Sequence, residues 1–227
     1  MRDINELDLQ LLFPKDVQSA VEIQNNLSKS LKIQELETQK IQYIGGLDVS
    51  YLDKYALGVL VILDNELNIV DIISQKAGVE FPYIPGFLAF REAPVILECL
   101  RKSSIKPDVL IFDGQGIVHP RGFGIASHIG VLLDVPSIGV AKSRLYGVCD
   151  KPTRVGQAEP IYDEVGNLIG YCYLSKRNTN PICISPGHLC DPDSALSFVE
   201  SLIRGYKLPE PTRLAHIYTQ RLKSTEE

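Results

Sequence analysis

The order of the elements predicted between residues 41 and 141 constrains the fold of this chain more than any other feature. Three strand-like runs follow one another with short connections, at residues 41–51, 55–63 and 67–75. Short connections between successive strands are typical of an antiparallel meander. A helix is expected over 87–102, with a restart at Pro94. A short, wholly apolar strand that ends in an acid at 107–113 and a second, fully buried strand at 136–141 then enclose a helix at 122–134, and this order indicates a parallel crossover.

The meander and the crossover together predict an α/β domain with a mixed β-sheet and helices on both faces, which is the element order of the ribonuclease H-like fold. Strands and turns are also expected over 153–185, and helices over 15–38, 191–204 and 211–222. No repeat, low-complexity tract or long linker divides the sequence. We therefore expect one domain over residues 1–227.

Composition excludes several classes of protein. No run of about 18 apolar residues occurs, so no membrane span is predicted, and the acidic residues near Met1 are unlike a signal peptide. The five cysteines are widely spaced and include no Cys-x-x-Cys pair, which favours reduced thiols in a cytoplasmic protein over a zinc ribbon or a disulfide framework. The net charge of −5 argues against a non-specific nucleic-acid binder. It does not argue against a nuclease, because the carboxylates of a metal site add negative charge.

Two aspartates stand where apolar strands lie or end. Asp48 lies in the first strand and Asp113 closes the fourth, and the predicted topology places these two strands side by side. Two neighbouring carboxylates repel each other unless a cation lies between them, and oxygen ligands favour Mg²⁺ or Mn²⁺. Glu92, on the helix between them in sequence, is a third candidate ligand. The alternative for each aspartate is a capping or turn carboxylate.

A proline- and glycine-rich loop precedes that helix. Pro82 and Pro85 fix the backbone on either side of Tyr83 and Ile84, and Gly86 allows a sharp turn. A rigid loop with an aromatic residue at its tip can insert between stacked bases. The alternative is an ordinary packed turn.

Three further side chains are candidates for contact with a phosphate or with the metal site. His119 follows the glycine-rich segment after Asp113, Lys142 follows the strand at 136–141, and His216 lies on the last predicted helix, four residues before Gln220. A lysine at the end of a buried strand can hold a phosphate as a point charge. His128 and His188 are expected to be structural.

Taken together, these segments resemble the endonuclease V family, whose members recognise deaminated adenine (inosine). The resemblance runs through residues 15–222 and depends on six separate blocks. They are Gly46–Ser50, Pro82–Glu92, Asp113–Gly116 with His119–Arg121, Gly139–Ser143, Ser185–His188 and Arg213–His216.

The resemblance implies Mg²⁺-dependent hydrolysis, with Mn²⁺ as a substitute, of the second phosphodiester bond 3′ to inosine, as part of DNA repair. It implies that Asp48 and Asp113 bind the metal and that Glu92 supports them through water. His216 occupies a position near the metals where some relatives carry an acid.

The resemblance also implies nucleic-acid contacts. Pro82–Pro85 correspond to the family's wedge, with Tyr83 at the tip, and His119 and Lys142 match residues near the scissile phosphate and the strand beyond it. The base pocket is expected to be formed mostly by backbone near Gly86, Gly114 and Gly116. The implied partner is inosine-containing DNA or RNA, bound by a cytoplasmic monomer that needs no membrane or protein partner.

Other functions are weighed beside this one. An inosine-specific endoribonuclease, or a structure-specific nuclease of the ribonuclease H-like fold, would share the acids. A catalytically silent nucleic-acid-binding module would keep the wedge. The joint presence of Asp48, Glu92, Asp113 and Lys142 argues against the silent module. No Gly-x-Ser-x-Gly nucleophile motif or nucleotide-binding glycine motif supports a hydrolase of small molecules.

Overall fold

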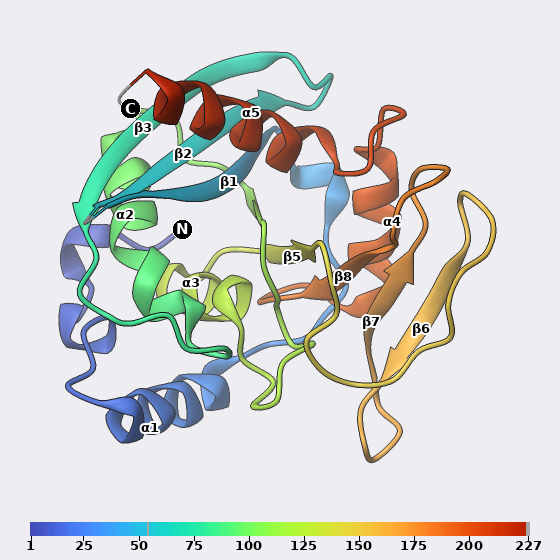
Figure 1. The fold of residues 1–227 in the computed structure, drawn as a ribbon, viewed down its shortest axis with the longest axis horizontal. Coiled ribbons are helices and arrows are strands. Elements are labelled where there is room, and N and C mark those ends of the chain that lie inside the picture. The colour runs from blue at the N-terminus through green and yellow to red at the C-terminus, as the bar shows by residue number, and fades with distance from the viewer. Residues whose placement is uncertain (54, 226–227) are drawn as a thin grey trace.

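The protein folds around an eight-stranded mixed sheet. The computed structural model describes residues 1–53 and 55–225, and the strand order is β3-β2-β1-β4-β5-β8-β7-β6 (Figure 1). The strands are β1 (Tyr43–Leu52), β2 (Tyr55–Asp64), β3 (Ile69–Gly78), β4 (Val109–Phe112), β5 (Ser137–Ala141), β6 (Ala158–Tyr162), β7 (Leu168–Tyr173) and β8 (Ile182–Pro186). The α-helices are α1 (Val17–Leu27), α2 (Leu88–Lys102), α3 (Ile125–Leu133), α4 (Pro192–Ser201) and α5 (Glu210–Ser224). Short 3₁₀ turns lie at Ile4–Glu6, Leu9–Leu11, Ser28–Ser30 and Thr38–Lys40.

The pairing of the strands confirms the predicted meander and crossover. β1 pairs antiparallel with β2, and β2 pairs antiparallel with β3. β4 lies parallel to β1 on one side and parallel to β5 on the other, so β1 and β4 are neighbours near the centre of the sheet. The strands β5, β8, β7 and β6 continue the sheet with antiparallel pairings.

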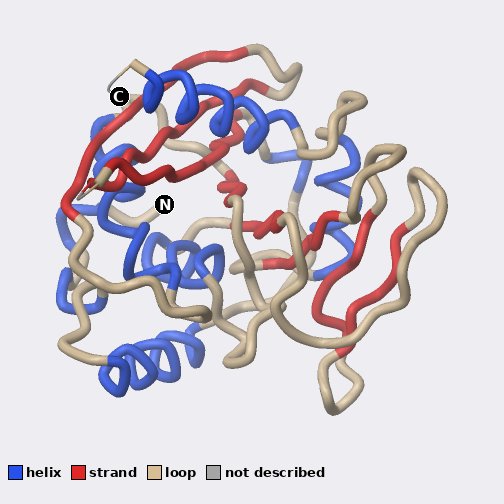
Figure 2. The backbone as a smooth tube through the Cα atoms, viewed as in Figure 1, coloured by secondary structure: helices blue, strands red, loops and turns tan. Residues whose placement is uncertain are grey.

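Helices cover both faces, as expected (Figures 1 and 2). The alternation of side chains along β2 shows why, because every second residue points to the same face of a strand. Leu60 and Ile62 join the core beneath α2 and α3. Val59, Val61 and Leu63 join the cluster beneath α5. Both faces of β2 are thereby buried, which explains its continuous apolar sequence.

One predicted helix boundary and one predicted interruption of a helix are wrong. The first helix ends at Leu27 rather than near residue 38, because the backbone of Lys32 bonds instead to the loop after β8. The Lys32 amide donates to His188 Nδ1, and the Lys32 carbonyl accepts from the Leu189 amide. The predicted restart at Pro94 is also absent, since α2 continues through it. A proline inside a helix removes one hydrogen bond, and the nine buried residues of α2 compensate for that loss.

The prediction of reduced thiols is wrong for one pair. Cys149 and Cys172 form a disulfide, whereas Cys99, Cys183 and Cys190 are free and buried. The fold brings the pair together because Val148 bridges to Tyr162 on β6, and β6 places Glu159 opposite Cys172 on β7. A sequence separation of 23 residues gives no sign of this contact. None of the helices in the described ranges is long and apolar enough to cross a membrane.

Candidate active site

Asp48 and Asp113 meet at the carboxyl ends of β1 and β4. The two strands are parallel, with Leu47 opposite Phe112, so the residue that follows each of these two lies at the same edge. Asp48, Asp113 and His216 each offer one possible ligand atom, and these three atoms lie within 4.8 Å of one another. Asp48 is buried, and the other two side chains are partly exposed. The predicted juxtaposition of the two aspartates is present.

The close approach of α5 to β1 places His216 over Asp48. A Cβ atom on Gly46 would lie 2.2 Å from the carbonyl carbon of Pro211, so only glycine allows this distance. His216 Nδ1 lies 3.3 Å from Asp48 Oδ2, and the Thr219 hydroxyl donates to the same oxygen. The packing of helix on strand therefore delivers two polar contacts to one carboxylate.

The electrostatics of this group fit a bound cation. Burial raises the pKa of Asp48, the nearby Asp113 charge raises it further, and the Thr219 hydrogen bond only partly opposes both. Lys142 Nζ lies 2.6 Å from Asp113 Oδ2. Burial opposes the charge on Lys142, but Asp113 and Asp48 outweigh it and raise the pKa of Lys142. Two carboxylates and an imidazole, held at a cost in electrostatic free energy, form a donor set suited to a divalent ion.

Glu92 reaches the same edge of the sheet from α2. It lines a small cavity of about 160 Å³ together with Asp48 and Asp113, although it lies outside the group of three candidate ligands. Burial raises the pKa of Glu92 to about 8, and Asp48 and Asp113 add to this effect. The Tyr51 hydroxyl donates to Glu92 Oε1 at 2.9 Å and holds the carboxylate in place.

Three residues of the predicted wedge loop are exposed to solvent, namely Pro82, Tyr83 and Pro85. The Tyr83 side chain is 69% exposed. Ile84 points the other way and packs in the cluster of Phe81, Phe87 and Phe90. Gly86 has φ +85°, a conformation that L side chains rarely adopt. The loop is thus anchored on its inner side with Tyr83 at its outer tip.

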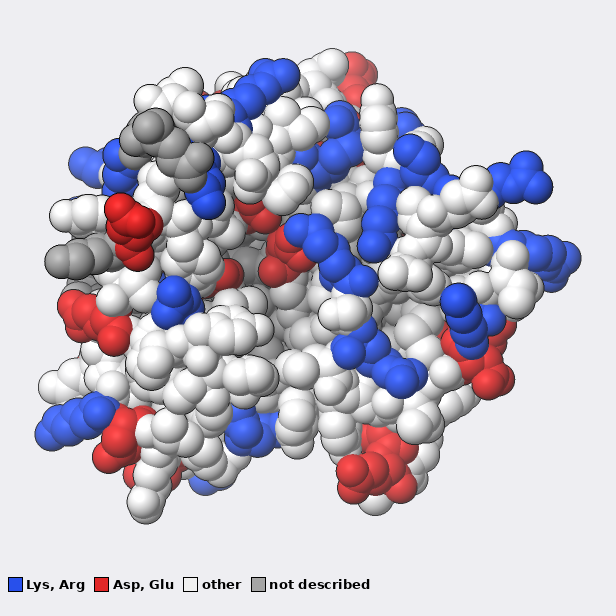
Figure 3. Space-filling view, viewed as in Figure 1, with Lys and Arg blue, Asp and Glu red and all other residues white. Residues whose placement is uncertain are grey.

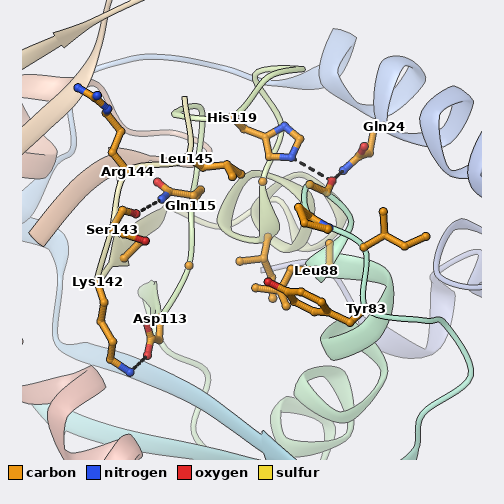
Figure 4. A pocket seen from close by; sticks show the side chains of 18 residues that line it. Gln24, Tyr83, Leu88, Asp113, Gln115, His119, Lys142, Ser143, Arg144 and Leu145 are labelled. Carbon is orange, nitrogen blue, oxygen red and sulfur yellow. Dashed lines mark hydrogen bonds and ion pairs between the residues drawn. The ribbon is translucent and has the colours of Figure 1, made fainter. Parts of the chain in front are cut away.

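A cavity of about 290 Å³ lies between this loop and the end of β5 (Figure 4). Its lining includes all the predicted contact residues except Pro82 and Gly116; they are Tyr83, Ile84, Pro85, Gly86, Gly114, His119 and Lys142. Asp113 also lines it, so the cavity adjoins the acidic group. Gly116 has a packing role, because a Cβ atom there would lie 1.9 Å from the Pro186 carbonyl oxygen.

His119 is buried and has both ring nitrogens engaged. Nδ1 accepts from the Arg121 amide at 3.1 Å, so Nε2 carries the proton and donates to the Gly86 carbonyl at 3.0 Å. Burial lowers the pKa of His119 to about 4, which keeps the ring neutral. The structure therefore ties His119 to the wedge loop, and its contact with nucleic acid stays a prediction.

Several side chains that contact the candidate site or the wedge loop give little signal in the sequence. Thr219 lies one turn from His216 and contacts Asp48. The spacing along the predicted helix instead indicates Gln220 as the polar neighbour of His216. Tyr51 lies in β1, three residues after Asp48. Gln115 donates to the Ser143 carbonyl at 2.7 Å and joins the Asp113 loop to the Lys142 loop. Gln24 lies among apolar residues at helical spacing, and this misplaced polar residue was the one available signal.

The charged surface agrees with this arrangement. Figure 3, which has the same view as Figure 1, shows acidic side chains inside a hollow near the middle of the molecule, with Lys and Arg side chains gathered beside it. A hollow with acids at its floor and cations along its side suits a metal ion and a phosphate backbone together.

Comparisons with known proteins agree with the fold and the site. The family model described as Endonuclease V matches residues 25–217. The endonuclease V of Kosmotoga olearia is 44% identical over 209 residues, which cover 91% of this chain and 92% of that protein. The crystal structure of endonuclease V from Bacillus subtilis has a TM-score of 0.88 at 30% identity, covering 96% of this chain and 97% of that one.

A third comparison includes a nucleic acid. Endonuclease V of Ciona intestinalis, in complex with a DNA that contains an inosine followed by a ribo-adenosine, has a TM-score of 0.82 at 28% identity, covering 93% of this chain and 100% of that one. The endonuclease relatives, together with a mixed sheet that carries an acidic group at the ends of two central strands, define this protein as an endonuclease of α/β fold. Since the family model and the relatives match most of its length, the chain belongs to the endonuclease V family.

Proposed function

We propose that this enzyme recognises inosine in nucleic acid and hydrolyses the second phosphodiester bond 3′ to it. One observation carries the proposal: a single cavity is lined both by Tyr83 and Gly86 of the wedge loop and by Asp113 of the acidic group. Its volume of about 290 Å³ lies at the small end of the range of ligand pockets, roughly 300–1,000 Å³. The inosine-containing DNA bound by the Ciona intestinalis relative supports the same substrate here.

In this proposal the loop separates the strands and the cavity receives the base. Tyr83 inserts into the base stack, and the extruded hypoxanthine enters beside Gly86 and Gly114. Unstacking costs a few kcal/mol and is least for a mispaired base, so deaminated adenine is favoured before any contact with the base edge.

The cofactor in this proposal is Mg²⁺, with Mn²⁺ as a substitute, held by Asp48 and Asp113 with His216 beside them. When bound, such an ion lowers the pKa of water and neutralises charge on the phosphate. Glu92, oriented by Tyr51, positions a water molecule beside the two aspartates. Lys142 exchanges its ion pair with Asp113 for the phosphate. We further propose that the enzyme is a monomer in the cytoplasm and that it acts in DNA repair.

Cleavage of matched oligonucleotides tests the proposal. Single-stranded and duplex DNA and RNA, each with inosine or adenine at one position, are incubated with Mg²⁺ or with EDTA. We expect Mg²⁺-dependent cutting between the first and the second nucleotide 3′ to inosine, and little cutting of the adenine controls. Equal cutting of inosine and adenine substrates would refute the proposed function, and comparison of the DNA and RNA arms identifies the preferred sugar.

Replacing Tyr83 by alanine is expected to weaken binding to inosine-containing duplex by about ten- to a hundredfold, since a base–aromatic stack is worth about 1–3 kcal/mol. The side chain is largely exposed, so the melting temperature should change little. Fluorescence anisotropy with Ca²⁺ in place of Mg²⁺ measures the affinity. Tyr55→Ala, at another exposed tyrosine, serves as the control. Unchanged affinity in Tyr83→Ala would show that the loop does not act as a wedge.

A further inference from the structure

The backbone carbonyl of Gly86 accepts hydrogen bonds from three side chains. Gln24 Nε2 and His119 Nε2 each lie 3.0 Å from the oxygen, and Arg121 Nη2 lies 2.7 Å from it. A carbonyl oxygen has two lone pairs, so three donors saturate it. We call Gln24, His119, Arg121 and the Gly86 carbonyl the Gly86 cluster. It fixes the orientation of one peptide group in the wedge loop.

Gln24 completes this cluster from α1. Its amide also donates to the Phe123 carbonyl at 3.2 Å, and its Oε1 accepts from Arg121 Nε at 2.6 Å. Within α1, all of which is described, Ala20 and Gln24 are the buried residues. A buried amide is unfavourable unless its hydrogen bonds are made, and here both its donor and its acceptor groups are used. The helix therefore contacts the loop through this polar side chain in addition to the apolar contacts of Ala20 and Val21 with the phenylalanine cluster beneath the loop.

The other two members of the cluster are also held in place. The Arg121 guanidinium lies 4.3 Å from the centre of the Phe87 ring, and its Nε and Nη2 bond to different partners. The neutral ring of His119 has a single tautomer, set by the Arg121 amide at Nδ1. The geometry of the cluster is thus determined from both sides of the Gly86 carbonyl.

The position of Gly86 explains what the cluster controls. Tyr83 lies three residues before it, and α2, which carries Glu92, begins two residues after it. In Figure 4, His119 and Gln24 approach the loop from one side, and Tyr83 projects along the cavity that ends at Asp113. A shift of the Gly86 peptide would move the wedge relative to the acidic group.

We propose that Gln24 is a positioning residue for base selection. Through the Gly86 cluster it sets the position of the Pro82–Pro85 loop over the cavity, and it thereby determines how well an extruded hypoxanthine is held. It does not touch the scissile phosphate. This inference depends on the proposed function, because the base that enters the cavity is the one proposed above.

Replacement of Gln24 by methionine tests the inference, because methionine keeps the length of the side chain and removes its hydrogen bonds. We expect KM for an inosine-containing duplex to rise about tenfold, as loss of one or two buried hydrogen bonds implies, with kcat within about twofold of wild type. Gln18→Met is the matched control, since Gln18 is exposed on the same helix and bonds only to Glu22 among the contacts described. All assays are made well below the lowest melting temperature of the set.

A double substitution separates positioning from a general loss of structure. In a Tyr83→Ala background, Gln24→Met is expected to raise KM less than twofold, because the residue that it positions is absent. Additive effects of the two substitutions would overturn the inference. So would an unchanged KM in Gln24→Met, or a fall in kcat with no change in KM.

A second variant keeps the test decisive if Gln24→Met does not fold. Arg121→Lys keeps the charge but lacks the planar guanidinium, whose Nε and Nη2 bond separately to Gln24 and Gly86. We expect the same rise in KM, and an unchanged KM would overturn the inference. The wild-type enzyme distinguishes the two proposals. Equal cutting of inosine and adenine by wild type would refute the proposed function. A clear wild-type preference that Gln24→Met and Arg121→Lys both retain, with unchanged KM, would refute the role of the cluster alone.

Discussion

Asp113→Asn is expected to lower the rate of Mg²⁺-dependent cleavage at inosine by about a thousandfold or more. Asp113 and Asp48 supply the two carboxylates of the candidate metal site, and a catalytic metal ion contributes several kcal/mol of transition-state stabilisation. Each 1.4 kcal/mol corresponds to about a factor of ten in rate. Asp48→Asn is expected to have a similar effect, and single-turnover cleavage of a labelled duplex measures both.

Neither substitution should unfold the protein. Asp48 is held in its charged form against burial and against the charge of Asp113, so an uncharged asparagine removes an unfavourable interaction and leaves an oxygen to accept from Thr219. The melting temperature of Asp48→Asn without metal should therefore be no lower than that of wild type. Asp113→Asn loses an ion pair with Lys142 that is partly exposed and contributes little to stability. Asp108→Asn is the matched control for Asp113→Asn, because the two aspartates lie at opposite ends of β4. Asp108 accepts from the backbone amides of Gln42 and Tyr43. Near-normal cleavage by Asp113→Asn would contradict the site.

The sequence was sufficient to predict the central strands, because the pattern within each segment and the length of the connections indicate the same topology there. The runs that became β1, β2 and β3 have short connections, and the largely apolar β4 and β5 favour a buried position. Once β1 and β4 are adjacent and parallel, the register places Asp48 and Asp113 at one edge. The closeness of Asp48 and Asp113 therefore follows from the topology of the sheet.

The parts that could not be predicted depend on contacts between distant segments. The end of α1 is decided by backbone bonds from Lys32 to residues 188 and 189, which propensity along the chain does not include. Gln24 interrupts an apolar face, but only the fold shows that its partners are Gly86, Arg121 and Phe123. The contact of Thr219 with Asp48 likewise depends on how closely Gly46 lets α5 approach β1. Helical spacing alone cannot give that distance.

Acid is expected to destabilise the protein through His128. This side chain is completely buried in α3, with its ring 5.1 Å from Phe90 and 5.5 Å from Phe123. Burial lowers its pKa from 6.5 to about 4, which a contact with the Leu11 backbone only partly offsets. Below about pH 6.5 the unfolded chain binds a proton at this residue and the folded chain does not, so stability falls as the pH falls toward 4.

The size of this effect follows from the difference between the two pKa values. About 2.5 units at 1.36 kcal/mol each gives about 3 kcal/mol, lost progressively between pH 6.5 and 4. Urea unfolding at pH 7 and pH 4.5 measures the loss, and His128→Leu should lose about 2–3 kcal/mol less than wild type. Ser127→Ala, a buried neighbour that does not titrate, should shift stability by the same amount at both pH values. If wild type and His128→Leu lose equal stability on acidification, His128 is not the acid-sensitive group.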